Sequence, residues 1–112
     1  LGNDSIYTEG GNDVVDGNAG DDQIFTGEGR DSVKGGTGND TIFSGADDYN
    51  SDTVDGGGGN DYISGTYGND FLYGGAGHDT LQGGDEPDDA ADNPEAGGSD
   101  YMDGGAGNDV IN

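Results

Sequence analysis

Residues 35–43 read GGTGNDTIF, a nine-residue unit in which a glycine-rich turn is followed by Asp40 and by the aliphatic residue Ile42. The unit recurs in both directions along the chain, and aligning it on its aspartate gives eleven repeats. The aspartates are Asp4, Asp13, Asp22, Asp31, Asp40, Asp52, Asp61, Asp70, Asp79, Asp100 and Asp109. Eight of the ten steps between them are nine residues long, and the two longer steps place insertions near residues 46–51 and 85–98. We therefore interpret residues 1–112 as one repeat array rather than several domains.

The residue two positions after each aspartate is apolar in every repeat. These residues are Ile6, Val15, Ile24, Val33, Ile42, Val54, Ile63, Leu72, Leu81, Met102 and Ile111. An apolar residue at this fixed place predicts a short strand with one inward side chain per repeat. One nonapeptide then supplies a turn and a strand, and two supply a coil of about 18 residues whose strands stack about 4.8 Å apart. The pattern predicts an all-β fold.

The composition excludes several classes of protein. The chain carries 25 acidic residues against two basic ones, for a formal net charge of −23, and it contains 27 glycines and no cysteine. A disulfide framework and a cysteine-based metal site are excluded. No apolar run is long enough to cross a membrane, so we expect no membrane insertion. We also expect no nucleic-acid partner, because this surface would repel a polyanion.

The repeat has the chemistry of a calcium site. Glycine-rich turns adopt positive φ and bring carbonyl oxygens together, and carbonyl and carboxylate oxygens are the ligands that calcium prefers. Stacking places successive aspartates about one coil apart, where two bare carboxylates repel by ~3 kcal/mol at an effective dielectric of 20. We therefore expect divalent ions between the coils to be a structural component of the fold.

The unit G-G-x-G-x-D-x-U-x, with U aliphatic, resembles the calcium-binding nonapeptide of RTX proteins, which are bacterial polypeptides exported by type I secretion. The resemblance implies a right-handed parallel β-roll of about eleven repeats with stacked calcium (Ca2+) ions between the turns. It implies as ligands the eleven motif aspartates and the carbonyls of the glycine turns. The glycines assigned to this role are Gly36, Gly38, Gly57, Gly59, Gly75, Gly77, Gly105 and Gly107.

The two edges of the predicted roll differ in sequence. Turns leading into the odd-numbered repeats match or nearly match the motif, whereas those leading into the even-numbered repeats are degenerate and include both insertions. We expect up to five ions on the odd edge and about four on the even edge, so about nine in total. Arg30 and Lys34 both lie in the fourth repeat, where a cation either replaces an ion in part or is simply exposed.

Two further features have alternative interpretations. Tyr7, Phe25 and Phe43 end successive odd-numbered strands and predict an outward aromatic stripe. The stripe indicates cross-strand stacking or a seam against a neighbouring domain. His78, the only histidine, occupies a turn position that is usually Asn or Asp here, and we expect it to be exposed.

The resemblance implies a calcium-dependent folding module of a secreted bacterial protein, located outside the cell or at its surface. Its expected partners are calcium ions, the rest of the parent polypeptide and the type I secretion apparatus. The alternatives are a non-catalytic C-terminal module of a secreted protease, lipase or alginate epimerase, and an extender segment of a surface adhesin. A disordered calcium buffer is disfavoured by the aliphatic periodicity. We expect no catalytic residues here, and the chain starts and stops within a repeat, so we expect a fragment of a larger protein.

Overall fold

The computed structural model describes residues 2–45, 50–84 and 100–112, and the regular elements in these ranges are all strands. They are β1 (Ser5–Tyr7), β2 (Val14–Asp16), β3 (Gln23–Phe25), β4 (Ser32–Thr37), β5 (Thr41–Phe43), β6 (Thr53–Gly58), β7 (Tyr62–Ser64), β8 (Phe71–Ala76), β9 (Thr80–Gln82), β10 (Tyr101–Ala106) and β11 (Val110–Ile111). Each strand begins directly after a motif aspartate, as the repeat predicts. The described residues contain no helix that could span a membrane.

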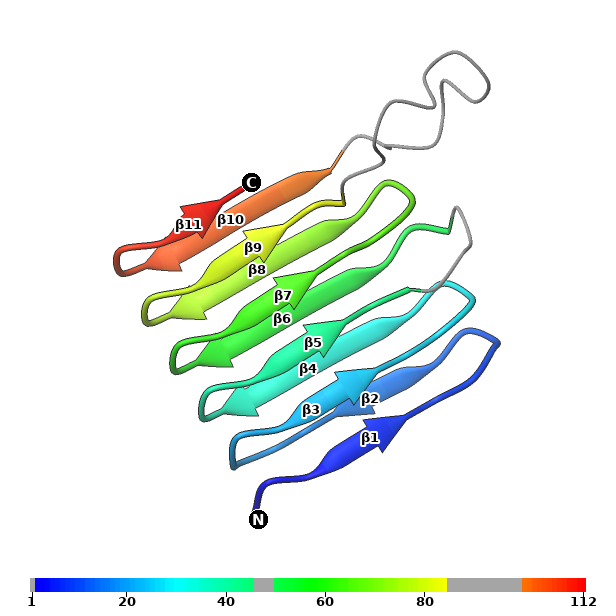
Figure 1. The fold of residues 1–112 in the computed structure, drawn as a ribbon, viewed down its shortest axis with the longest axis horizontal. Coiled ribbons are helices and arrows are strands. Elements are labelled where there is room, and N and C mark those ends of the chain that lie inside the picture. The colour runs from blue at the N-terminus through cyan, green and yellow to red at the C-terminus, as the bar shows by residue number, and fades with distance from the viewer. Residues whose placement is uncertain (1, 46–49, 85–99) are drawn as a thin grey trace.

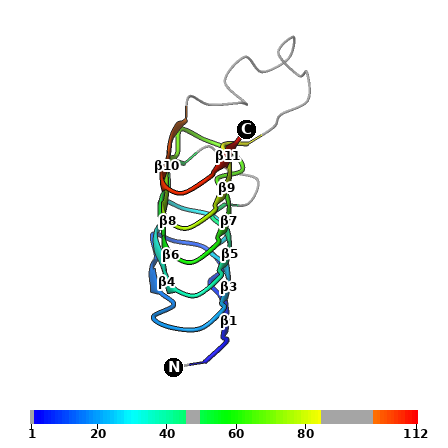
Figure 2. The same ribbon diagram turned by 90° about the vertical axis from the view of Figure 1, so that its left-hand side faces the viewer.

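The strands form two parallel sheets that face each other. Odd-numbered strands make one sheet in the order β1-β3-β5-β7-β9-β11, and even-numbered strands make the other in the order β2-β4-β6-β8-β10 (Figure 1). The chain crosses from one sheet to the other at every turn, so two repeats complete one coil (Figure 2). The predicted all-β, parallel solenoid is confirmed.

The register keeps equivalent repeat positions side by side. Ile24 pairs with Ile42 across a regular step of two repeats. Val33 pairs with Val54 across the first insertion, and Leu72 pairs with Met102 across the second. Residues 46–49 and 85–99 of the two predicted insertions lie outside the described residues. The first strand after each insertion nevertheless pairs in the regular register with the strand one coil earlier, β6 with β4 and β10 with β8.

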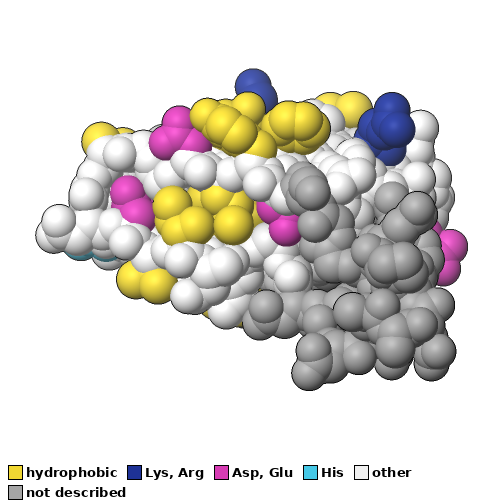
Figure 3. Space-filling model, turned by 90° about the horizontal axis from the view of Figure 1, so that it is seen from above, with side chains coloured by type: hydrophobic (Ala, Val, Ile, Leu, Met, Phe, Trp, Pro, Cys, Tyr) yellow, Lys and Arg dark blue, Asp and Glu magenta, His cyan; other side chains and the backbone are white. Residues whose placement is uncertain are grey.

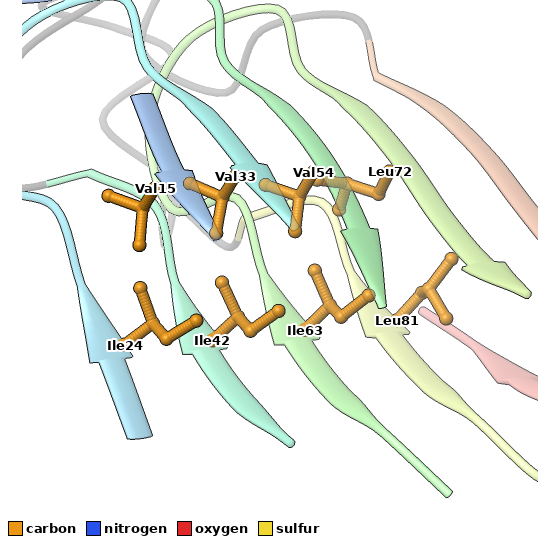
Figure 4. Packing of buried hydrophobic residues seen from close by; sticks show 8 residues of the cluster. All are labelled: Val15, Ile24, Val33, Ile42, Val54, Ile63, Leu72 and Leu81. Atoms are coloured by element: carbon orange, nitrogen blue, oxygen red, sulfur yellow. The ribbon is translucent and has the colours of Figure 1, made fainter. Parts of the chain in front are cut away.

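The core is a double row of aliphatic side chains between the sheets. Among the described residues this core has eight buried hydrophobic side chains. Figure 4 shows those of the even-numbered sheet, Val15, Val33, Val54 and Leu72, opposite those of the odd-numbered sheet, Ile24, Ile42, Ile63 and Leu81. Ile6 and Met102 pack against this cluster and are partly buried. Ile111 differs from the prediction, since it is 47% exposed. It lies on the outermost strand of its sheet, where a neighbouring strand covers only one side.

Aromatic side chains line the outside of the odd-numbered sheet. The rings of Tyr7 and Phe25 stack with centroids 5.0 Å apart, and those of Phe25 and Phe43 stack at 5.1 Å. The predicted stripe is therefore present and its rings stack across the strands. Its use as a seam against a neighbouring domain stays a prediction. On the even-numbered sheet Phe71 and Tyr101 are also exposed. Figure 3 shows that hydrophobic side chains reach the surface in separate groups on the face seen from above.

Candidate metal sites

The motif aspartates form two files, one on each edge of the roll. The odd edge contains Asp4, Asp22, Asp40, Asp61, Asp79 and Asp109, and the even edge contains Asp13, Asp31, Asp52, Asp70 and Asp100. Within each file, the main-chain N–H of one aspartate donates to Oδ1 of the aspartate one coil later. Asp22 donates to Asp40 Oδ1 at 2.8 Å, and Asp31 donates to Asp52 Oδ1 at 2.8 Å. This bond links all neighbouring members of both files.

The second oxygen is buried in eight of the eleven motif carboxylates. Oδ2 has no hydrogen-bond partner among the described residues in Asp13, Asp22, Asp31, Asp40, Asp61 and Asp79. The Oδ2 atoms of Asp52 and Asp70 are buried as well. A buried carboxylate oxygen without a partner is costly, because burial removes the water that would stabilise its charge. A regular file of such atoms indicates that a positively charged ligand completes the structure.

The first glycine of each odd-edge turn makes room for this oxygen. A Cβ built on Gly17 would lie 2.6 Å from Asp22 Oδ2 and 2.5 Å from the carbonyl oxygen of Gly35. On Gly56 it would lie 2.5 Å from Asp61 Oδ2 and 2.7 Å from the Gly74 carbonyl oxygen. We call the space above each first glycine a cradle. Each cradle therefore brings a carboxylate oxygen close to a main-chain oxygen of the next coil. Both are hard ligands of the kind that calcium prefers.

The glycines predicted as ligands occupy two other kinds of position. Gly36, Gly57, Gly75 and Gly105 pair with one another in the even-numbered sheet. Gly38, Gly59, Gly77 and Gly107 have positive φ, and the carbonyls of the first three each face the counterpart glycine in the next coil, as Gly38 faces Gly59. Their role as ligands remains a prediction. The sequence analysis did not select the first glycines of the turns as ligands, although each of them stands five residues before a motif aspartate. They are Gly35, Gly56, Gly74 and Gly104.

Burial and mutual repulsion perturb the aspartates in the middle of the odd edge. The pKa of Asp61 is raised to about 6, chiefly by burial and in addition by the negative charges of Asp40, Asp79 and Asp55, against the lowering effect of the hydrogen bond from the Asp40 N–H. Burial also raises the pKa of Asp40, with added repulsion from Asp22 and Asp21. The predicted repulsion between stacked carboxylates is thus present at this edge.

A second ladder runs alongside the odd file, through the residue before each aspartate. Asn60 donates its main-chain N–H to Asn39 Oδ1 at 2.7 Å, and His78 donates to Asn60 Oδ1 at 2.9 Å. His78 is exposed as predicted, and its Nδ1 accepts the main-chain N–H of Asn108 at 2.9 Å. The sequence analysis did not predict this ladder, although the recurrence of Asn or Asp at this position is a signal that indicates it.

The even edge differs from the odd edge at the first position of its turns. Thr8, Thr26 and Ser44 stand where Gly65 and Gly83 stand in the later turns. Their main-chain N–H groups make the same bonds, since Thr8 donates to Phe25 and Gly65 donates to Gln82, in each case to the carbonyl. The predicted difference between the edges therefore lies in the side chains at this position and not in the main-chain hydrogen bonds. Arg30 and Lys34 are both exposed, which favours the second of their two interpretations.

The oxygen set fits calcium although carboxylates do not cluster. Among the described ranges, no group of three or more His, Cys, Asp or Glu side chains is placed to hold a metal ion. Each cradle instead combines a single buried carboxylate oxygen with main-chain carbonyls. Calcium accepts such mixed oxygen ligands at 2.3–2.6 Å.

Comparison with known families gives one match. A family model described as the RTX calcium-binding nonapeptide repeat matches residues 1–24, 16–50, 25–63, 55–89 and 96–112. Searches of curated proteins and of solved structures found no match. The matched segments overlap and cover most of the chain, including both files of aspartates.

Proposed function

The chain belongs to the RTX calcium-binding nonapeptide repeat family, and from this premise we propose that it is a calcium-dependent folding module of a larger secreted bacterial protein. The observation that carries the proposal is the row of buried Oδ2 atoms on the odd edge, those of Asp22, Asp40, Asp61 and Asp79, which lack a hydrogen-bond partner among the described residues. Without a cation, the burial of these charged atoms destabilises the folded state. With calcium, the same atoms become ligands that stabilise it.

The ligands are the motif aspartates together with main-chain oxygens of the turns. Bound calcium supplies positive charge between coils, and the chain itself supplies fixed oxygen atoms, held in file by the N–H to Oδ1 bonds. We expect up to five ions on the odd edge and about four on the even edge. Nine ions would offset most of the formal charge of −23.

The calcium requirement provides a switch between compartments. Weak calcium sites stay empty at cytosolic concentrations and fill at the millimolar concentrations found outside cells. The chain then remains unfolded during export by a type I secretion apparatus and folds after it emerges. The high negative charge and the small aliphatic core support this order of events, because neither favours folding without ions.

We propose that the module itself is non-catalytic. The buried aspartates belong to the two files, where one carboxylate oxygen accepts a main-chain N–H and the other is buried. We therefore expect these oxygens to stabilise the fold rather than to contact a substrate. An RTX enzyme would have its active site elsewhere in the parent polypeptide. An adhesin would use the roll as a spacer, and calcium-dependent self-association of the chain would favour that alternative.

The test is far-UV circular dichroism together with hydrodynamic size, measured in chelator, in magnesium and in calcium. We expect an expanded chain in chelator and a compact β signal in millimolar calcium. Magnesium should substitute poorly, because it requires smaller octahedral sites and releases its water reluctantly. An unchanged spectrum on adding millimolar calcium would refute the proposal.

A further inference from the structure

Three aromatic side chains form a patch on the outer face of the even-numbered sheet. Phe71 and Tyr73 lie two residues apart in β8, and Tyr101 pairs with Phe71 from the neighbouring strand β10. Leu72, between the first two, is buried in the core, so alternation along the strand directs Phe71 and Tyr73 outward. The three aromatic side chains are between 37% and 52% exposed. We call Phe71, Tyr73 and Tyr101 the aromatic patch.

The rings of the aromatic patch are tilted against one another. The Tyr73 and Tyr101 rings have centroids 5.8 Å apart and an interplanar angle of 51°, and those of Phe71 and Tyr101 are 6.3 Å apart at 37°. On the odd-numbered sheet the rings of Tyr7 and Phe25 are almost parallel, at 1°, so each covers a face of the other. The face of an aromatic ring attracts a cation within about 6 Å of its centre. The tilted, exposed rings of the patch therefore offer faces to a cation.

Two exposed carboxylates flank Tyr73 in the register of the sheet. Asp55 of β6 pairs with Tyr73 on one side, and Asp103 of β10 pairs with it on the other. Neighbouring strands lie about 4.8 Å apart, so these two residues are roughly 10 Å apart with the aromatic ring between them. Oδ1 of Asp103 accepts the main-chain N–H of Gly105 at 3.0 Å, which orients the carboxylate. A cation over the Tyr73 ring is thus attracted by a negative charge on each side.

The same outer row of the sheet shows a cation between two carboxylates elsewhere. Lys34 of β4 lies between Asp16 and Asp55 in the register. Tyr73 occupies the equivalent place between Asp55 and Asp103, but its side chain supplies no positive charge. The sequence has only two basic residues, and the second lies in the turn before β4. A positive charge at Tyr73 therefore has to come from a partner.

We propose that the aromatic patch, together with Asp55 and Asp103, binds an arginine side chain of a basic partner peptide. Arginine fits this surface better than lysine, because its planar guanidinium stacks on an aromatic ring and also donates in a fork to a carboxylate. A second copy of this chain is a poorer occupant, since two chains with a formal charge of −23 repel each other. The inference goes beyond the proposed function, because it concerns the outer face of the folded roll and not its calcium sites.

The test is a titration of the calcium-folded chain against labelled tetra-arginine and tetra-lysine peptides at physiological ionic strength, followed by fluorescence anisotropy. We expect tetra-arginine to bind more tightly than tetra-lysine. Tyr73→Ser should weaken tetra-arginine binding roughly two- to five-fold, the effect of losing one exposed cation–π contact. Tyr7→Ser is the control, since Tyr7 is an exposed tyrosine on the other sheet, and its affinity should not change. Circular dichroism in calcium confirms that each variant is folded.

A pair of aspartate variants separates this site from general attraction to an acidic chain. Asp103 and Asp16 are both exposed, both occupy the third position of an even-numbered strand, and both accept the main-chain N–H two residues later, from Gly105 and Asn18. Each change to Asn removes one negative charge, but of the two only Asp103 pairs with Tyr73. We expect Asp103→Asn to weaken tetra-arginine binding up to about five-fold and Asp16→Asn to leave it nearly unchanged.

Three results would overturn the inference. The first is an equal loss of affinity in Asp103→Asn and Asp16→Asn, which would show that the peptide responds only to net charge. The second is unchanged tetra-arginine binding in Tyr73→Ser. The third is equal affinity of the unchanged chain for tetra-arginine and tetra-lysine, because a ring and a fork of carboxylates distinguish a guanidinium from an ammonium group.

Discussion

The main-chain N–H of Asp40 donates to Oδ1 of Asp61 at 2.8 Å, although 21 residues and the first insertion separate the two in sequence. The bond fixes the Asp61 carboxylate against the preceding coil. Its other oxygen, Oδ2, is then held buried over Gly56, next to the Gly74 carbonyl. One oxygen of the Asp61 carboxylate thus accepts a hydrogen bond from the preceding coil, and the other is the atom that we propose binds calcium.

Replacing Asp61 with Asn should weaken the calcium response. The amide oxygen of Asn can still accept the Asp40 N–H, but the negative charge of the ligand is lost. At a hundredfold excess of calcium over its dissociation constant, losing one site removes about 2.7 kcal/mol of stabilisation. Calcium titrations followed by circular dichroism should show a higher folding midpoint.

Asp21→Asn is the control for this variant. It removes one negative charge as well, but Asp21 is exposed, and Asn39 shows that an asparagine serves at the equivalent ladder position. We expect its midpoint to stay close to that of the unchanged chain. Equal midpoints for Asp61→Asn and Asp21→Asn would show that Asp61 contributes only its charge and binds no ion.

Adding a methyl group at Gly56 should disrupt a cradle, whereas the same change two residues later should not. The Cβ of Gly56→Ala would lie 2.5 Å from Asp61 Oδ2, so the carboxylate must move. We expect a loss of roughly 1–3 kcal/mol, the usual cost of overpacking. Gly58→Ala meets no heavy atom within 4 Å and should be neutral or slightly stabilising. Urea unfolding in calcium measures both, and equal stabilities would contradict the cradle geometry.

Acid should stabilise the ion-free fold and weaken calcium binding. Burial raises the pKa of Asp61 from 3.8 to about 6, so protonation favours the folded state. That stabilisation is fully present below pH 3.8 and is lost as the pH rises through about 6. In chelator, the β signal should therefore grow between pH 7 and pH 4. Over the same range the calcium midpoint should rise, because protons compete with the ion.

The pH prediction is checked by circular dichroism titrations with and without calcium. Asp61→Asn provides the control, since it removes the titrating group and should reduce the gain of β signal in chelator. A calcium midpoint that does not change between pH 7 and pH 4 would contradict the role of these carboxylates as ligands.

Truncation of the core should depend on position in the stack. Ile42 is fully buried, and Ile42→Ala should cost about 2–5 kcal/mol. Ile111 occupies the same repeat position but is half exposed, so Ile111→Ala should cost under about 1 kcal/mol. Urea unfolding in saturating calcium compares the two. Similar losses for both would mean that Ile111 is covered in solution.

Much of this architecture could be predicted from the repeat. The period of nine fixed the inward places of residues such as Ile24 and Val33, and alternation between edges fixed which aspartates share a file. The insertions were predictable as interruptions of the period. The hydrogen bond from Asp40 to Asp61 was not, because a repeat does not specify how each carboxylate is rotated or which of its oxygens meets the next coil.

The sequence alone determined the all-β repeat, its two unequal edges and the calcium chemistry, because each depends on residue type at a fixed spacing. The tertiary structure alone decided that Gly56 and its equivalents leave room for a carboxylate oxygen, and that the Thr66 hydroxyl lies next to Gly45. These contacts join residues from different coils. Their geometry follows from how the coils stack in space, which no single repeat contains.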